Sequence, residues 1–117
     1  MATFGSSVGD ARVTTVEEFI LPTSVRWMFP DATAPFDILT PALPWLQPHF
    51  ANERGHLLQS IQSFVIQVDG ITVVVDTGVG NAKPRGGGIS DFNRRSGPFL
   101  EEVVAAGFPV ESVDFVI

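Results

Sequence analysis

Cysteine is absent from the chain. Without a thiol the protein can form no disulfide, use no thiolate nucleophile and bind no zinc through sulfur. Basic residues are also scarce: 7 Lys and Arg stand against 13 Asp and Glu, which gives a net charge of −6. They are spread along the sequence, and the closest pair is Arg94-Arg95. Because a nucleic-acid partner requires clustered positive charge, we expect none.

Long apolar runs are missing as well. No stretch approaches the roughly 20 residues of a membrane-spanning helix, and the opening residues, MATFGSSVGDARV, have neither the basic start nor the apolar core of a signal peptide. We therefore expect a cytoplasmic protein with no membrane partner. The 117 residues are 44% hydrophobic and include ten Phe, which is enough to form the core of one domain.

Histidine is nearly absent, since only His49 and His56 are present. Pairs of histidines that bind one metal are typically spaced as His-x-His or His-x₃-His, which brings two imidazoles to one site. The seven-residue spacing found here does not. We interpret both histidines as loop or surface residues and expect no metal to be bound by this chain alone.

The order of apolar and turn-forming segments predicts a mixed α/β (α+β) fold, with a mostly antiparallel sheet and one packed helix. Pro22 is expected to end a strand at Ala11–Leu21, and the density of proline after it predicts no regular element. The expected segments are a first strand region at 1–21, a proline-rich apolar loop at 22–56, a hairpin at 57–76, a glycine-rich loop at 77–96, a helix at 97–107 and a strand at 113–117.

The hairpin is the clearest local signal. Asp69-Gly70 separates two β runs, and an Asp-Gly pair suits a two-residue type I′ turn, which requires positive φ at both positions. This turn would pair Val68 with Ile71 and Phe64 with Val75. One face then carries Phe64, Ile66, Val68, Ile71, Val73 and Val75, and this apolar face requires a covering layer. Asp76 lies at the open end of the hairpin, on the less apolar face.

The helix at 97–107 is expected to start near Pro98, with Glu101 and Glu102 favouring its positive end. Gly107 is expected to follow its last residue. Its apolar stripe would consist of Phe99, Leu100, Val103, Val104 and Gly107.

Asp76 opens the triplet Asp-Thr-Gly, which allows two interpretations. One is a homodimeric aspartic protease of the retroviral type, in which two such aspartates share one proton. Val79 follows the triplet, however, where those proteases usually have Ser or Ala, and no glycine-rich flap hairpin is present. The expected helix also falls where those proteases have strands. This interpretation is the alternative.

The second interpretation accounts for more of the chain. The segments SFVIQVDGITVVVDTGVGNAKPR (63–85) and GPFLEEVVAAGFPVESVDFVI (97–117) resemble the N-terminal half of metallo-β-lactamase-fold hydrolases. LPWLQPHF (43–50) and GNAKPR (80–85) are similar to its lactonase-like and organophosphate-hydrolase-like branch. The resemblance implies an αβ/βα sandwich, two divalent metals, expected to be zinc, and hydrolysis of an ester, lactone or phosphoester by a metal-activated water.

The same resemblance implies roles for two residues. In the family, the aspartate that matches Asp76 lies beneath the metal site and hydrogen-bonds to its ligand motif, which orients the ligands. Gly78 would allow the tight turn that follows. The competing interpretation is an aspartate that caps the Thr77–Gly80 turn.

In the family, a strand similar to 113–117 leads directly into a His-x-His-x-Asp-His metal motif. The chain ends at Ile117. We therefore expect only the N-terminal portion of the domain, inactive alone, with the C-terminal half of the fold as its partner. An uncovered sheet would also favour a homo-oligomer.

Four apolar residues of the proline-rich loop are candidates for the mouth of a substrate pocket, since an apolar loop over a cleft excludes water. Ordinary packing of the loop is the competing explanation. The candidates are Trp27, Trp45, Leu46 and Phe50.

Overall fold

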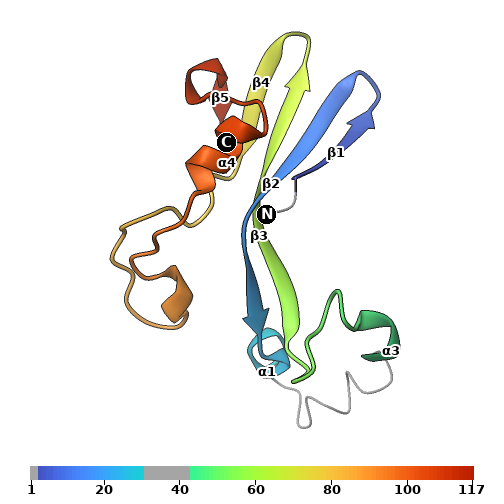
Figure 1. Ribbon diagram of the computed structural model, residues 1–117, viewed down its shortest axis with the longest axis vertical. Coiled ribbons are helices and arrows are strands. Elements are labelled where there is room, and N and C mark those ends of the chain that lie inside the picture. The colour runs from blue at the N-terminus through green and yellow to red at the C-terminus, as the bar shows by residue number, and fades with distance from the viewer. Residues whose placement is uncertain (1–2, 31–42) are drawn as a thin grey trace. The chain divides into compact units, whose positions relative to one another are not determined.

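The computed structural model describes residues 3–30 and 43–117 (Figure 1). The chain divides into two compact units, a sheet–helix unit of Met1–Phe19 with Ile61–Ile117 and a smaller unit of Ile20–Ser60. Five strands form one sheet in the order β1-β2-β3-β4-β5. They are β1 (Thr3–Val8), β2 (Ala11–Thr23), β3 (Leu57–Val68), β4 (Ile71–Val75) and β5 (Phe115–Val116). The helices are α1 (Val25–Met28), α3 (Leu43–Leu46), α4 (Phe99–Ala105) and the 3₁₀ turns η1 (Ser90–Phe92) and η2 (Val110–Ser112). This is the mixed α+β fold that the sequence predicted.

The first strand region contains two strands where the sequence predicted one. β1 pairs antiparallel with β2, from Val8 opposite Ala11 to Thr3 opposite Val16. Gly9, with a φ of 59°, forms the turn between them. The residues of β1, TFGSSV, are all exposed and include glycine and serine, so neither apolar alternation nor β propensity revealed this strand.

Pro22 does not end β2, contrary to the prediction. The strand continues to Thr23, and Pro22 is an exposed residue within it. The pairing with β1 ends at Val16. After Val16, the residues of β2 therefore need not donate an N–H to β1. A strand tolerates proline where no partner strand requires its N–H.

The β3–β4 hairpin has the predicted register. Val68 lies opposite Ile71, and Phe64 lies opposite Val75. Asp69 and Gly70 have φ values of 51° and 77°, the positive values that a type I′ turn requires.

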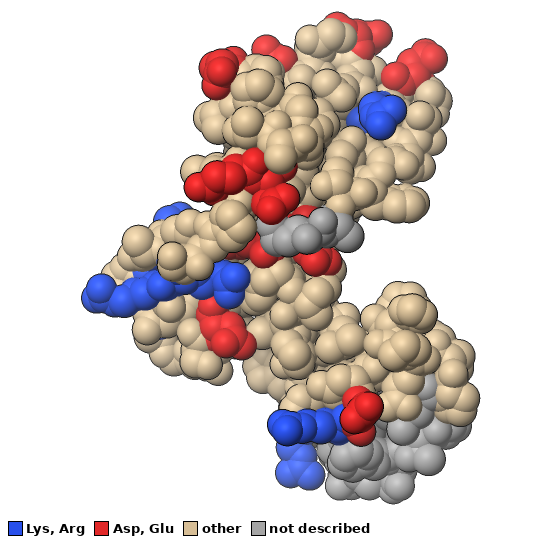
Figure 2. Space-filling view, in the orientation of Figure 1, with Lys and Arg blue, Asp and Glu red and all other residues tan. Residues whose placement is uncertain are grey.

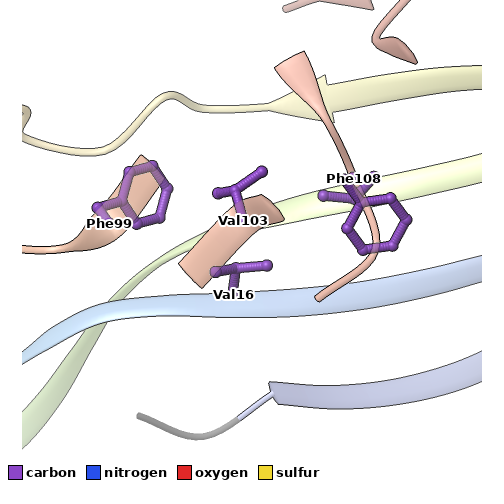
Figure 3. Packing of buried hydrophobic residues seen from close by; sticks show 5 residues of the cluster. Val16, Phe99, Val103 and Phe108 are labelled. Atoms are coloured by element: carbon purple, nitrogen blue, oxygen red, sulfur yellow. The ribbon is translucent and has the colours of Figure 1, made fainter. Parts of the chain in front are cut away.

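The helix α4 covers one face of the sheet (Figures 1 and 3). Figure 3 shows Phe99 and Val103 of α4 close to Val16 of β2, with Phe108 beside them. Val65 completes this buried cluster, and Val74 packs against it. The helix therefore lies on the less apolar face of the hairpin. On the opposite face Phe64 and Ile71 are exposed and the other residues are half-buried, so the described residues cover the most apolar side of the hairpin only in part.

The helix is shorter than predicted, and its buried stripe is narrower. Phe99 and Val103 are buried, whereas Leu100 and Val104 are exposed, contrary to the prediction. A helix of two turns that lies on a sheet can bury its i and i+4 positions and leave the neighbouring ones in solvent. Gly107, with a φ of 96°, follows the last cap residue as expected.

The smaller unit contains α1 and α3, where the proline density predicted no regular element. Ser24 caps α1 by accepting a hydrogen bond from the N–H of Arg26 at 3.3 Å. Pro44 is the second residue of α3, in the first turn, where a helix does not need the missing N–H. Val25, Leu46 and Ala51 form a separate buried cluster with Leu57 packed against it. No helix in the described ranges is long and apolar enough to span a membrane.

Candidate functional site

The carboxyl ends of β4 and β5 lie side by side, because these two strands are parallel neighbours. The N–H of Ile117 donates to the carbonyl of Val74 at 3.0 Å, and the N–H of Asp76 donates to the carbonyl of Ile117 at 2.9 Å. At the other end of the pair, the N–H of Thr72 donates to Oδ2 of Asp114 at 2.8 Å. Asp76 therefore lies directly beside Ile117, the residue that follows β5.

Asp76 begins a turn in the left-handed region of φ. Its φ is 63°, and that of Gly78 is 73°. Oδ1 of Asp76 accepts a hydrogen bond from the N–H of Gly78 at 2.8 Å, the geometry of an aspartate that closes its own turn. Within the described part of the chain, Oδ2 accepts no hydrogen bond, and the residue is exposed. One carboxylate oxygen therefore takes part in the local turn.

Glu18 on β2 is the residue that sequence reasoning missed. Its side chain is only 2% exposed, and its two oxygens accept hydrogen bonds from consecutive N–H groups. Val79 donates to Oε2 at 2.7 Å, and Gly80 donates to Oε1 at 3.1 Å. Nε of Arg95 lies 3.7 Å from Oε1 and supplies the opposite charge. Alternate residues of β2 are buried, and Glu18 follows Thr14 and Val16 on the buried face. This alternation is the sequence signal that could have identified Glu18 as a buried carboxylate.

Hydrogen bonds connect the first part of the glycine-rich loop, its near arm (77–85), with the last part and the residue after it, the far arm (91–97). Asn81 and Gly97 exchange two hydrogen bonds, of 2.7 Å and 3.0 Å. The N–H of Ala82 donates to the carbonyl of Arg95 at 2.8 Å. Nη1 of Arg85 donates to the carbonyl of Val79 at 2.6 Å. These bonds connect the residues before the glycine run at 86–88 with the residues after it.

Folding gathers basic residues that are dispersed in the sequence. The N–H of Arg94 donates to the carbonyl of Lys83, and Arg85 and Arg95 belong to the same loop. Figure 2 shows basic side chains gathered on the left, over the part of the chain that Figure 1 draws in orange. Arg85 donates to the carbonyl of Val79 within the loop, and Arg95 lies beside Glu18 of β2.

An apolar cavity of about 250 Å³ lies between α4 and the sheet. Ser63 lines it together with Val65, Val74 and Val103. Within the described residues, the buried Oγ of Ser63 has no hydrogen-bond partner. Leu100 and Val116, which also line the cavity, are exposed.

The described residues do not form a metal-binding group. In residues 3–30 and 43–117, no three His, Asp or Glu side chains lie close enough together to hold an ion. The N–H of His56 donates to Oδ1 of Asn52, and the ring of His49 lies 6.5 Å from that of Phe50. The two histidines make separate local contacts.

The four candidate pocket residues have different surroundings. Leu46 is buried in the core of the smaller unit, whereas Trp27, Trp45 and Phe50 are exposed. A hollow of about 460 Å³ in this unit is lined by Gln47, Pro48, Ala51, Asn52 and Glu53, and by none of the four candidates. Leu46 thus packs in the core of the smaller unit. A role of the three aromatic residues in a substrate pocket stays a prediction.

No protein-family model and no curated protein matches the sequence. Solved structures do match its fold. The hydrolase AbOPH of the β-lactamase superfamily aligns with a TM-score of 0.67 and 21% identity, over 97% of this chain and 34% of that chain. A probable metal-dependent hydrolase from Staphylococcus aureus aligns with a TM-score of 0.64 and 18% identity, over 95% and 38%. AidC, a dizinc quorum-quenching lactonase in complex with the product N-hexanoyl-L-homoserine, aligns with a TM-score of 0.65 and 15% identity, over 97% and 34%.

These comparisons confirm the fold that the resemblance predicted. The chain has the fold of the N-terminal part of a metallo-β-lactamase-superfamily hydrolase. It spans little more than a third of the length of the structures that it matches.

Proposed function

We propose that this chain is the N-terminal part of a single metal-dependent hydrolase domain that cleaves ester, lactone or phosphoester bonds in small molecules. The observation that carries the proposal is the meeting of Asp76 with Ile117 at the carboxyl ends of two parallel strands. Sites in layered α/β proteins form at such strand ends. The fold shared with known hydrolases supports this choice of chemistry.

The residues described here do not by themselves fit a metal centre, because no group of potential ligands comes together. The ligands of the two expected zinc ions would therefore come from the C-terminal half of the fold, supplied as further polypeptide. The contribution of this chain is Asp76, with Oδ1 engaged by Gly78 and Oδ2 available to orient a ligand. A cytoplasmic location and inactivity of this chain alone are parts of the same proposal.

The test compares two aspartates in the complete domain. Asp76→Asn removes the charge and retains a side-chain oxygen for the bond from Gly78. The matched control is Asp69→Asn, since Asp69 also has a positive φ, a conformation that Asn tolerates, but lies at the opposite end of the hairpin. We expect bound metal and the rate of hydrolysis of an aryl ester, a lactone and an aryl phosphotriester to fall in Asp76→Asn and to be unchanged in Asp69→Asn.

A complete domain that retains no metal after dialysis and hydrolyses none of the three substrates would refute the proposal. Equal behaviour of the two variants would refute only the role of Asp76.

The parallel β4–β5 pair and the helix α4 favour the hydrolase over the aspartic-protease alternative, whose members have strands where α4 lies. We expect no peptide cleavage at acidic pH, measured with a quenched fluorescent peptide. Cleavage that Asp76→Asn abolishes would restore the alternative.

A further inference from the structure

We propose that Glu18 is the positioning residue for the turn that carries Asp76. The inference extends the proposed function, in which that turn supports the metal ligands. The buried carboxylate of Glu18 holds the N–H groups of Val79 and Gly80, so β2 determines the path of the chain immediately after Asp76.

The first support is the chemistry of the Glu18 carboxylate. A buried charge is stable only where hydrogen bonds and an opposite charge replace water. Glu18 obtains two N–H donors from the turn and the guanidinium of Arg95. Hydrogen bonds to an ionised acceptor are stronger than neutral ones. The turn therefore has a charge-dependent anchor in addition to its own backbone geometry.

The second support is the close approach of Glu18 to Gly78. A Cβ atom at position 78 would overlap Oε2 of Glu18, and the φ of 73° also disfavours other residues. The N–H of Gly78 is the group that donates to Oδ1 of Asp76. Three consecutive N–H groups thus bind two carboxylates: residue 78 binds Asp76, and residues 79 and 80 bind Glu18. Moving Glu18 would disturb the group that orients Asp76.

The third support is the attachment of the far arm of the loop to the same place on β2. The guanidinium carbon of Arg95 lies 3.4 Å from the ring centroid of Phe19, a cation–π contact. Nη1 of Arg95 donates to the carbonyl of Asp91, and Phe92 meets Phe19 edge to face at 6.1 Å. The near arm of the loop therefore binds Glu18, and the far arm contacts both Glu18 and the adjacent Phe19.

The experiment uses three variants of the full chain, followed by hydrogen exchange and mass spectrometry. Glu18→Gln keeps the size of the side chain and removes its charge. Glu18→Asp keeps the charge on a shorter side chain. Glu17→Gln is the matched control, because it removes the same charge from the neighbouring position of β2, while the N–H groups of Val79 and Gly80 donate to Glu18.

We expect peptides that cover 77–84 to exchange about tenfold faster in Glu18→Gln, since bonds to a charged acceptor contribute that much protection. Peptides of the β3–β4 hairpin should be unchanged. Glu18→Asp should recover part of the protection, and Glu17→Gln should match the unaltered chain. In the complete domain, Glu18→Gln should lower kcat for the substrate that is hydrolysed best, with little change in KM.

Unchanged exchange at 77–84 in Glu18→Gln would overturn the proposal. Equal loss of protection in the hairpin and in the loop, in both Glu18 variants, would also overturn it, because Glu18 would then stabilise the whole unit without positioning the turn. Exchange does not depend on activity. If the unaltered domain hydrolyses nothing while the exchange pattern is as expected, the proposed function fails and the positioning role stands.

Discussion

Two residues 60 positions apart, Glu18 and Gly78, define the turn after β4. The left-handed backbone of Gly78 and the lack of a side chain both matter, since the carboxylate of Glu18 occupies the space that a Cβ would need. Gly9, in the β1–β2 turn, also has a positive φ, of 59°, but has open space around it. Comparing substitutions at the two glycines therefore separates the free-energy cost of a positive φ from the cost of the steric contact with Glu18.

At this scale we predict that Gly78→Ala destabilises the protein more than Gly9→Ala. The left-handed conformation alone costs a non-glycine residue about 1–2 kcal/mol, which applies to both positions. At position 78 the Cβ must also displace Glu18 from the N–H groups that it binds. Urea denaturation followed by far-ultraviolet circular dichroism measures the difference. Equal losses would show that Glu18 moves aside without cost.

At the scale of elements, α4 is held by few contacts. Phe99 and Val103 enter the core with Val16 and Val65, while the adjacent Val104 is 49% exposed. The helix has only seven residues, and so short a helix is not stable in isolation. Its packing against the sheet therefore accounts for its presence.

We predict that Val103→Ala lowers the free energy of unfolding by about 2 kcal/mol, through lost burial and the cavity left behind. Val104→Ala is the matched control, and its effect should stay within about 0.5 kcal/mol, as for most surface changes. Denaturant unfolding of the two variants provides the measurement. A similar loss for both would mean that α4 is stabilised by its own sequence and not by contact with the sheet.

At the scale of the whole molecule, the sheet has more apolar surface than the described residues cover. Phe64 and Ile71 on one face, and Phe115, Val116 and Ile117 at the β5 edge, are all exposed. Exposed apolar faces and unpaired strand edges favour association. The C-terminal half of the fold, as proposed, would cover these surfaces.

We predict that the chain alone associates, and that Phe64→Lys reduces the association. Burial of a large apolar side chain contributes about 1.5–3 kcal/mol, which a lysine at the contact would remove. Val104→Lys is the control, because Val104 is exposed on α4, which lies on the opposite face of the sheet. Sedimentation velocity at several concentrations measures the effect. A monodisperse monomer with a sharp, cooperative melt would contradict the expectation.

We also predict that the chain alone retains less than one equivalent of zinc after dialysis. No three potential ligands come together among the described residues, and the chain has no cysteine. Zinc sites require three or four protein ligands. Elemental analysis measures the metal, with the complete domain as the comparison. One or more equivalents retained by the chain would require a site within it.

The sequence by itself determined the local features of this protein. Asp69-Gly70 predicted the turn and register of the β3–β4 hairpin, and Gly107 marked the end of α4. These features depend on residues close together in the chain, for which backbone sterics and periodicity are sufficient. The likeness of 63–85 and 97–117 to hydrolase segments indicated the family fold, which the structural comparisons confirm.

Only the tertiary structure decided which face of the hairpin the helix covers and which carboxylate anchors the loop after Asp76. The more apolar face was the natural candidate for the core, yet α4 lies on the face that contains Val65 and Ser63. In the sequence, Glu18 is one of two adjacent acidic residues in an expected strand. Its hydrogen-bond partners, Val79 and Gly80, lie more than 60 positions away. The binding of a buried charge depends on groups that only the folded chain brings together, so no local pattern could reveal it.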